Sequence, residues 1–204
     1  MKLLAYEVDK RPFLGVFNEN ETWAYPISAA GMEYRSMKDL IREAGPSEME
    51  MLDYISKKAP GDVTGAAPVE EIRIVSPIPE PDQDIICLGI NYMDHAAESA
   101  RFQKEEFARP EKAIYFSKRV NRTNDPDGII PAHKNLTNQL DYEAELAVII
   151  KKDAKDVKPE EVKDYIFGYT IMNDVSAREV QTEHKQWYFG KSLDGFTPRG
   201  PCIM

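Results

Sequence analysis

A proline-rich stretch, SPIPEPDQD at residues 76–84, constrains the fold of this chain more than any other feature. Proline fixes the backbone angle φ and lacks an N–H donor, so three prolines in five residues can continue neither a helix nor a central strand. We interpret residues 76–83 as a linker. It divides the chain into a small module at residues 1–75 and a larger module at residues 84–204.

The small module is predicted to be α+β. Short apolar runs separated by turn residues fill residues 1–27, a pattern typical of an antiparallel meander. Ser36 can cap one short helix, and Pro46 can begin a second helix in which apolar residues recur at helical spacing. A strand that ends at Val75 completes the module.

The larger module is predicted to consist of strands, short helices and loops. Four apolar segments are predicted to be strands: IICLGI, AIYFSK, LDYEAELAVII and FGYTIMNDV. The segment NYMDHAAESARF is predicted to be a helix. The sequence reaches Met204 in an apolar segment without a turn, and an open sheet edge there would leave backbone groups unpaired. We therefore expect further strands and interpret this module as incomplete at its C-terminus.

Charge and composition argue against several classes of function. The formal net charge is −9, and an acidic surface does not suit a nucleic-acid partner. One short basic group around Lys118 is too small for a nucleic-acid groove, and we expect it to face solvent or a ligand; Lys118 is a candidate substrate-binding residue. Two cysteines are too few for a disulfide framework, which favours a reduced, cytoplasmic setting. We find no signal peptide and no apolar run long enough to cross a membrane, so we expect no membrane partner.

Two carboxylates lie in the otherwise apolar segment LDYEAELAVII. Because alternate side chains of a strand share a face, Glu143 and Glu145 are predicted to point the same way. An edge strand with a solvated end would explain them, but the apolar run beyond them favours burial on both faces. Two buried carboxylates this close repel each other unless a divalent ion such as Mg²⁺, Mn²⁺ or Ca²⁺ compensates. Pairing with buried Arg or Lys side chains is the structural alternative.

Asp174 is the candidate third metal ligand. It follows the apolar strand FGYTIMN, so its carboxylate can meet ligands from a neighbouring strand. The alternative is a helix N-cap or turn residue before Ser176.

Five further residues could take part in chemistry. His95 and Glu98 are neighbours at i and i+3 on the predicted helix, and a histidine oriented by a carboxylate is a common general base. Lys191, between glycines in GKSLDG, could polarise a substrate carbonyl. Arg178 and Gln181 share a face if SAREVQ is helical, and could bind a substrate carboxylate. The alternative in each case is an ordinary solvated side chain.

Five segments, taken in order, resemble the fumarylacetoacetate hydrolase family, and in particular its 2-hydroxyhepta-2,4-diene-1,7-dioate isomerase and acylpyruvase-like members. They are GINYMDHAAE, AIYFSK, LDYEAELAVII, GYTIMNDVSAREVQ and QWYFGKSLDGFTPRGP. The resemblance implies an α+β fold: a mixed β-sheet roll of the type found in the C-terminal domain of the family, preceded here by the small N-terminal module. It also implies a homodimer. A Thr- and Gly-rich loop that completes the substrate pocket of the family is absent before Met204.

The same resemblance implies roles for the candidate residues. Glu143, Glu145 and Asp174 match the three carboxylates that hold a divalent cation, for which we expect Mg²⁺ first and Mn²⁺ or Ca²⁺ as alternatives. His95 and Glu98 match a pair that activates water or moves a proton. Lys191 matches a lysine that contacts substrate. Arg178 and Gln181 match two positions that line the pocket.

The predicted function is a metal-dependent hydrolase or lyase acting on small 2-oxo acids through a metal-stabilised enolate. It would cleave the C–C bond of acylpyruvates, or decarboxylate or isomerise unsaturated dicarboxylic 2-oxo acids from aromatic catabolism. One alternative is an oxaloacetate decarboxylase. A second is a catalytically inactive, metal-stabilised relative that binds a 2-oxo acid without converting it.

Overall fold

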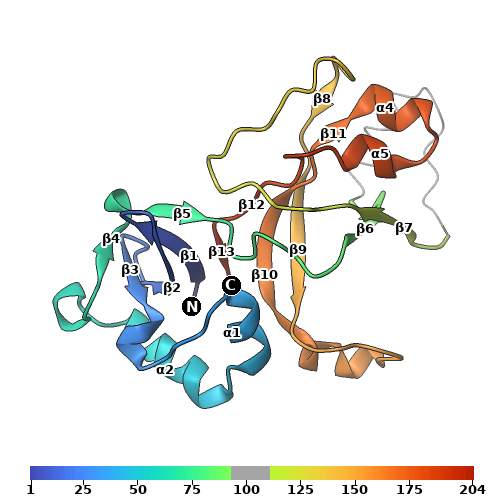
Figure 1. The fold of residues 1–204 in the computed structure, drawn as a ribbon. Helices are drawn as coiled ribbons and strands as arrows, with labels where there is room; N and C mark the ends of the chain where they lie inside the picture. The colour runs from blue at the N-terminus through green and yellow to red at the C-terminus, as the bar shows by residue number, and fades with distance from the viewer. Residues whose placement is uncertain (93–110) are drawn as a thin grey trace.

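The N-terminal residues supply five strands of a six-stranded antiparallel sheet in the computed structural model, which describes residues 1–92 and 111–204 (Figure 1). Three strands pair in sequence order, as the meander pattern of residues 1–27 predicted: β1 (Leu3–Val8), β2 (Arg11–Phe17) and β3 (Trp23–Pro26). β4 (Ala67–Pro68), which that pattern did not include, pairs with β3. The other edge of β1 pairs with β5 (Arg73–Val75) and with β13 (Cys202–Ile203).

Helices cover this sheet and complete an apolar core. Ser36 caps α1 (Met37–Glu43) as predicted, because its side chain accepts a hydrogen bond from the Asp39 N–H. Pro46 begins α2 (Pro46–Ser56). The short 3₁₀ helices are η1 (Ile27–Ala30), η2 (Pro60–Asp62) and η3 (Val69–Glu71). The two helices and the sheet bury a continuous apolar cluster that includes Leu3, Val16, Tyr25, Leu40 and Leu52.

The residues after the proline-rich stretch form small antiparallel sheets instead of one large sheet. β6 (Ile85–Gly89) pairs with β7 (Ile114–Lys118). β9 (Ala144–Ile150) pairs with β10 (Ile166–Asn173), whose other edge pairs with β12 (Arg199–Gly200). β8 (Leu140–Asp141) pairs with β11 (Ser176–Ala177). The helical segments are η4 (Pro159–Asp164), α4 (Arg178–Glu183) and α5 (Trp187–Lys191). Helices and antiparallel sheets together confirm the predicted α+β class.

The two lobes in Figure 1 are joined by more than the proline-rich stretch. Residues 76–84 contain no helix or strand. However, β13 returns to the first sheet, where Ile203 pairs with Leu3 and Cys202 with Leu4, so both termini lie where the lobes meet (Figure 1). The domain division at residues 76–83 therefore stays a prediction.

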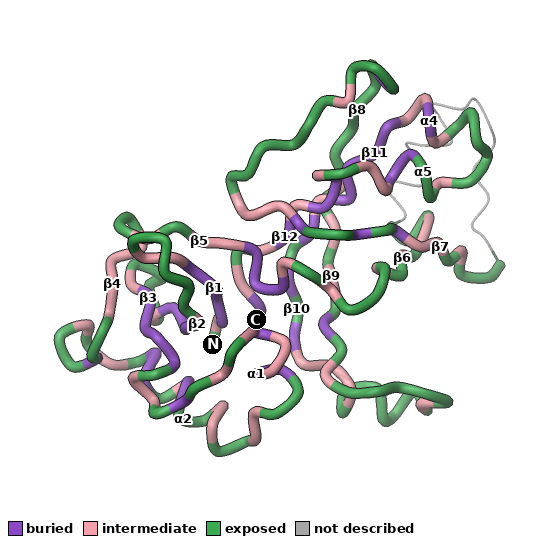
Figure 2. Tube along the Cα trace, in the orientation of Figure 1, coloured by how far each residue is buried: buried purple, intermediate pink, exposed green. Residues whose placement is uncertain are grey.

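Burial along β9 differs from the sequence prediction. We expected both faces of this strand to be buried, and this was wrong for the part of the chain that the structure describes. Ala147 and Ile149 face inward, whereas Leu146 is 60% exposed and Tyr142 76% exposed. The long loop before β8 is also mostly exposed (Figure 2). Among the described residues, no helix is both long enough and apolar enough to span a bilayer.

Candidate functional site

The Lys191 side chain lies at the centre of the candidate site. Its Nζ donates to Glu143 Oε2 and to Asp174 Oδ2, each at 2.8 Å, and to Ser176 Oγ at 2.8 Å. Because both carboxylate oxygens lie at hydrogen-bond distance from one atom, Glu143 and Asp174 converge on a single point. The side chains of Lys191 and Asp174 are each only 3% exposed, so solvent screens this ion pair weakly.

The strand register explains why these two acids meet. Asp174 follows β10 and Glu143 precedes β9, and these antiparallel strands pair Asn173 with Ala144. The Asp174 N–H donates to the Glu143 carbonyl oxygen at 2.8 Å, and the Glu143 N–H donates to Asn173 Oδ1 at 3.1 Å. The sequence interpretation of Asp174 as an acid that meets a neighbouring strand therefore agrees with its position.

Lys118 is a buried partner of Asp174. At the end of β7 it is 0% exposed, and its Nζ donates to Asp174 Oδ1 at 2.6 Å and to the Val175 carbonyl oxygen at 3.2 Å. Burial lowers the pKa of Lys118, and the Asp174 carboxylate opposes that shift. We expected Lys118 to face either solvent or a ligand. It does not face solvent, because its ammonium group is buried and donates to the Asp174 carboxylate.

Arg178 holds two acids in place. Its Nε and Nη2 donate to Asp141 Oδ2 at 2.9 and 2.7 Å, and its Nη1 donates to Glu143 Oε1 at 2.7 Å and to Gln181 Oε1 at 3.2 Å. Burial lowers the pKa of Arg178, but the hydrogen bonds and charges of Asp141 and Glu143 outweigh it and raise the pKa overall. Arg178 and Gln181 do share a face of a helix, as predicted, although they contact each other and Arg178 also contacts two protein acids.

Glu145 lies beside the same centre. It lines a pocket of about 340 Å³ together with Glu143, Asp174, Cys87 and Phe116. Cys87 is partly exposed, and burial followed by the nearby Asp174 charge raises its pKa to about 12. The thiol is therefore protonated at neutral pH.

Aromatic residues that the sequence did not single out support the lysine. The Phe116 ring lies 5.3 Å from Lys191 Nζ, and Trp187 packs edge-on against Phe116 with ring centroids 5.2 Å apart. Trp187 also lies so close to Gly89 that a Cβ atom there would be 2.1 Å from the indole ring. The i, i+4 spacing of Trp187 and Lys191 was the available sequence signal, because it places both on one side of α5.

The donor atoms suit a hard divalent cation, although basic groups contact them in this structure. Glu143 and Asp174 supply two convergent oxygens, and Glu145 faces the same pocket. Within residues 1–92 and 111–204, however, no group of three or more His, Cys, Asp or Glu side chains is arranged to hold a metal ion. The contacts of Glu143 with Lys191 and Arg178 are those that the structural alternative expected. His95 and Glu98 lie outside the described residues.

Comparisons with known proteins agree with this arrangement of segments. Residues 84–204 match the family model described as fumarylacetoacetate (FAA) hydrolase C-terminal. The oxaloacetate tautomerase YisK of Bacillus subtilis is 41% identical over 149 residues, covering 72% of this chain and 48% of that protein. This chain thus spans about half the length of that relative.

Two solved structures share the fold over the whole of this chain. A fumarylacetoacetate hydrolase from Exiguobacterium antarcticum superposes with a TM-score of 0.74 at 33% identity, covering 100% of this chain and 66% of that one. A maleylpyruvate hydrolase from Sphingobium sp. SYK-6 superposes with a TM-score of 0.68 at 26% identity, covering 100% of this chain and 67% of that one. Since the family model also matches more than half of the sequence, this chain belongs to the fumarylacetoacetate hydrolase family of enzymes.

Proposed function

We propose that the protein is a metal-dependent hydrolase or lyase that acts on small 2-oxo acids. The observation that supports this most strongly is the convergence of Glu143 Oε2 and Asp174 Oδ2 on one point, with Glu145 lining the same pocket. Two acids that meet in a nearly dry place need positive charge beside them, which Lys191 supplies in this structure, and their oxygen donors would also suit a hard divalent cation. Mg²⁺ is the first candidate, with Mn²⁺ or Ca²⁺ as alternatives.

Glu143, Glu145 and Asp174 would hold the ion, which when bound supplies the positive charge that stabilises an enolate oxygen of a 2-oxo acid. The protein's own residues would do the rest. Lys191 would add positive charge beside the substrate oxygen. Lys118 fixes the orientation of Asp174 from the opposite side, where it donates to Oδ1.

Proton transfer is assigned to residues outside the described part of the chain. We propose that His95, held by Glu98, activates water in a hydrolase or moves a proton in an isomerase or decarboxylase. Arg178 and Gln181 remain proposed substrate-binding residues, as does Lys118. Since Arg178 already contacts Asp141 and Glu143, we propose that it acts on substrate chiefly by orienting Glu143.

A second candidate reaction is keto–enol tautomerisation of oxaloacetate. The relative that is named an oxaloacetate tautomerase is 41% identical over 149 residues, which favours this reaction over decarboxylation of the same acid. Both reactions pass through an enolate of a 2-oxo acid, so the same residues would serve either.

The test is an assay of acetylpyruvate, fumarylpyruvate and oxaloacetate with Mg²⁺ or Mn²⁺, followed by the loss or gain of enol absorbance and by NMR of the products. We expect turnover of at least one of these acids by protein with bound metal. His95→Ala should abolish the rate while metal binding persists. Protein that binds metal but converts none of the three acids would instead be an inactive 2-oxo-acid-binding relative.

We also propose that the protein is a cytoplasmic homodimer that serves aromatic catabolism. The acidic net charge and the two free cysteines support a reduced compartment without a nucleic-acid partner. Sedimentation velocity on the purified protein tests the dimer, which a single species at the monomer mass of 23.2 kDa would contradict.

A further inference from the structure

Three acids of the candidate site are already paired with basic side chains without any added ion: Asp141, Glu143 and Asp174 contact Arg178, Lys191 and Lys118. Glu145 lines the same pocket and adds a fourth acid. A divalent cation entering this cluster would still leave it with excess positive charge. One of the basic groups must therefore yield its contacts when a metal ion binds.

Lys191 is the basic group whose contacts a bound metal ion would replace. Of the three, it alone contacts both Glu143 and Asp174, through one oxygen of each at 2.8 Å. Lys118 contacts the other oxygen of Asp174, Oδ1, together with the Val175 carbonyl oxygen. Arg178 contacts the other oxygen of Glu143, Oε1. The two oxygens that converge are therefore bound by Lys191 and by neither of its basic neighbours.

The hydrogen bonds of Lys191 are also fully used. An ammonium group has three N–H donors, and those of Lys191 go to Glu143, Asp174 and Ser176 Oγ. Lys191 therefore cannot donate to a substrate without giving up one of these contacts.

We propose that Lys191 and a divalent cation exchange at Glu143 Oε2 and Asp174 Oδ2. Without metal, Lys191 holds the two acids together. When metal binds, these oxygens turn to the cation, and the freed donors of Lys191 become available to the carboxylate or carbonyl oxygen of an anionic substrate. The inference rests on the proposed function, and it adds an order of events in which metal binding precedes productive substrate binding.

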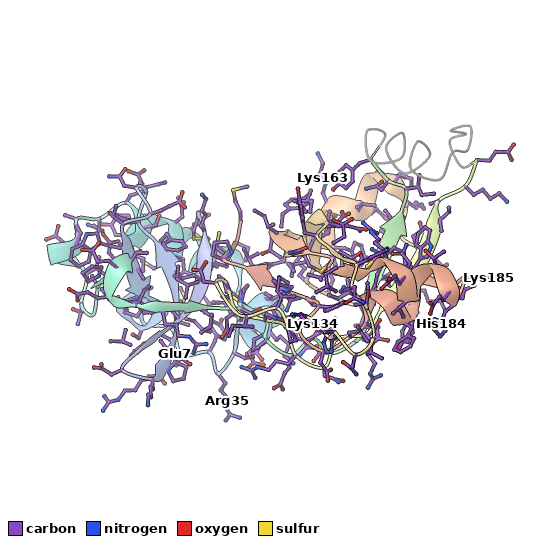
Figure 3. The ribbon with its side chains drawn as sticks, turned by 90° about the horizontal axis from the view of Figure 1, so that it is seen from above. Glu7, Arg35, Lys134, Lys163, His184 and Lys185 are labelled. Carbon is purple, nitrogen blue, oxygen red and sulfur yellow. The ribbon has the colours of Figure 1, made fainter. Side chains whose placement is uncertain are left out.

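If Lys191 competes with the metal ion, removing its ammonium group should increase the affinity of the site for a divalent cation. Lys191→Met removes the competing ammonium group and keeps much of its apolar stem. Isothermal titration of the full chain with Mn²⁺ should then give a dissociation constant about tenfold or more below that of the unchanged protein, because a unit charge a few ångströms away strongly opposes a dication. Lys163→Met is the matched control, since Lys163 is exposed on η4 and extends away from the ribbon (Figure 3); its affinity should not change.

An equal or weaker affinity in Lys191→Met would overturn the exchange, because Lys191 would then assist the metal site or be indifferent to it. That result leaves the proposed function intact, provided that the unchanged protein binds metal and converts a 2-oxo acid. If the unchanged protein binds no divalent ion, both proposals fail. The two failures are therefore distinguishable.

A second measurement needs no substitution at Lys191. Because Lys191 Nζ lies 5.3 Å from the Phe116 ring and Trp187 packs on that ring, movement of the ammonium group should change the emission of Trp187. Titration of the unchanged protein with Mg²⁺ should shift tryptophan fluorescence, and Trp187→Phe should remove the shift while Trp23 still emits. Metal binding by calorimetry without any change in Trp187 emission would contradict the exchange.

Discussion

The sheet of the first 75 residues and the region around Lys191 differ in what fills their interiors. In the first region the fully buried side chains are apolar, and they include Leu40, Leu52 and Val16. In the second, Lys118 at 0% exposed and Lys191 at 2% exposed are as deeply buried as those leucines. The comparison shows two ways of building an interior: by removing apolar surface from water, or by matching charges in a place that water barely reaches.

The two kinds of interior lose stability for different reasons when a side chain is replaced. Removing part of an apolar side chain costs the lost transfer free energy plus the cavity that remains. Removing one member of a buried ion pair leaves an unpaired charge, which costs more. The proposed active site also lies in the charged interior, because its candidate residues Glu143, Asp174 and Lys191 are part of that charge cluster.

Asp174→Asn should have the largest effect. It leaves Lys118 buried without its counter-ion and removes one of the two convergent oxygens from Lys191, so we expect a loss of about 4 kcal/mol in the free energy of unfolding and loss of metal binding. Urea denaturation and Mn²⁺ calorimetry measure the two effects. Asp153→Asn, at an exposed position, is the control and should change stability by less than about 0.5 kcal/mol. An Asp174→Asn protein as stable as the control would show that buried Lys118 does not depend on Asp174 as its counter-ion.

Leu52→Ala tests the apolar interior. Leu52 is 0% exposed, and its truncation should cost about 3 kcal/mol in the free energy of unfolding. Metal affinity measured at a temperature where the variant is folded should equal that of the unchanged protein. A large change in metal affinity would mean that the two interiors are coupled, through β13 in the first sheet.

A matched pair of glycine substitutions sharpens the contrast in packing. A Cβ at Gly89 would lie 2.1 Å from Trp187, whereas a Cβ at Gly61 would have no neighbour within 4 Å. Gly89→Ala should therefore cost about 2 kcal/mol and shift tryptophan emission, since the indole must move. Gly61→Ala should leave both stability and emission nearly unchanged. Equal effects of the two substitutions would show that Trp187 does not pack against β6 in solution.

The smallest effect concerns a helix end in the first region. The Gly45 N–H and then the Tyr34 hydroxyl donate to the Glu48 carboxylate, and these hydrogen bonds hold the pKa of Glu48 below its ordinary value. A carboxyl whose folded pKa is lowered stabilises the protein above its unfolded pKa, and that contribution is lost as pH falls through the folded pKa. Glu48→Gln should thus lower Tm by a few degrees at pH 7, and the difference should disappear on acidification. A difference independent of pH would contradict this role of the carboxylate.

Local patterns in the sequence were sufficient to predict much of the structure. Ser36 caps a helix, Pro46 begins one, and the apolar runs of residues 1–27 form a meander, because each of these depends on neighbours within a few residues. Burial of both faces of β9 was predicted wrongly. An apolar run indicates which residues can be buried, but which face is covered depends on segments distant in sequence.

The candidate site shows the same division. Residue type and apolar surroundings were enough to select the acids that could share a point: Glu143 beside one strand and Asp174 at the end of another. The partners of those acids follow from the folded chain, since Lys118 lies 56 residues before Asp174 and Lys191 lies 48 residues after Glu143. Charge pairing at these separations depends on how β7, β10 and α5 pack together, and no pattern of neighbouring residues encodes that packing.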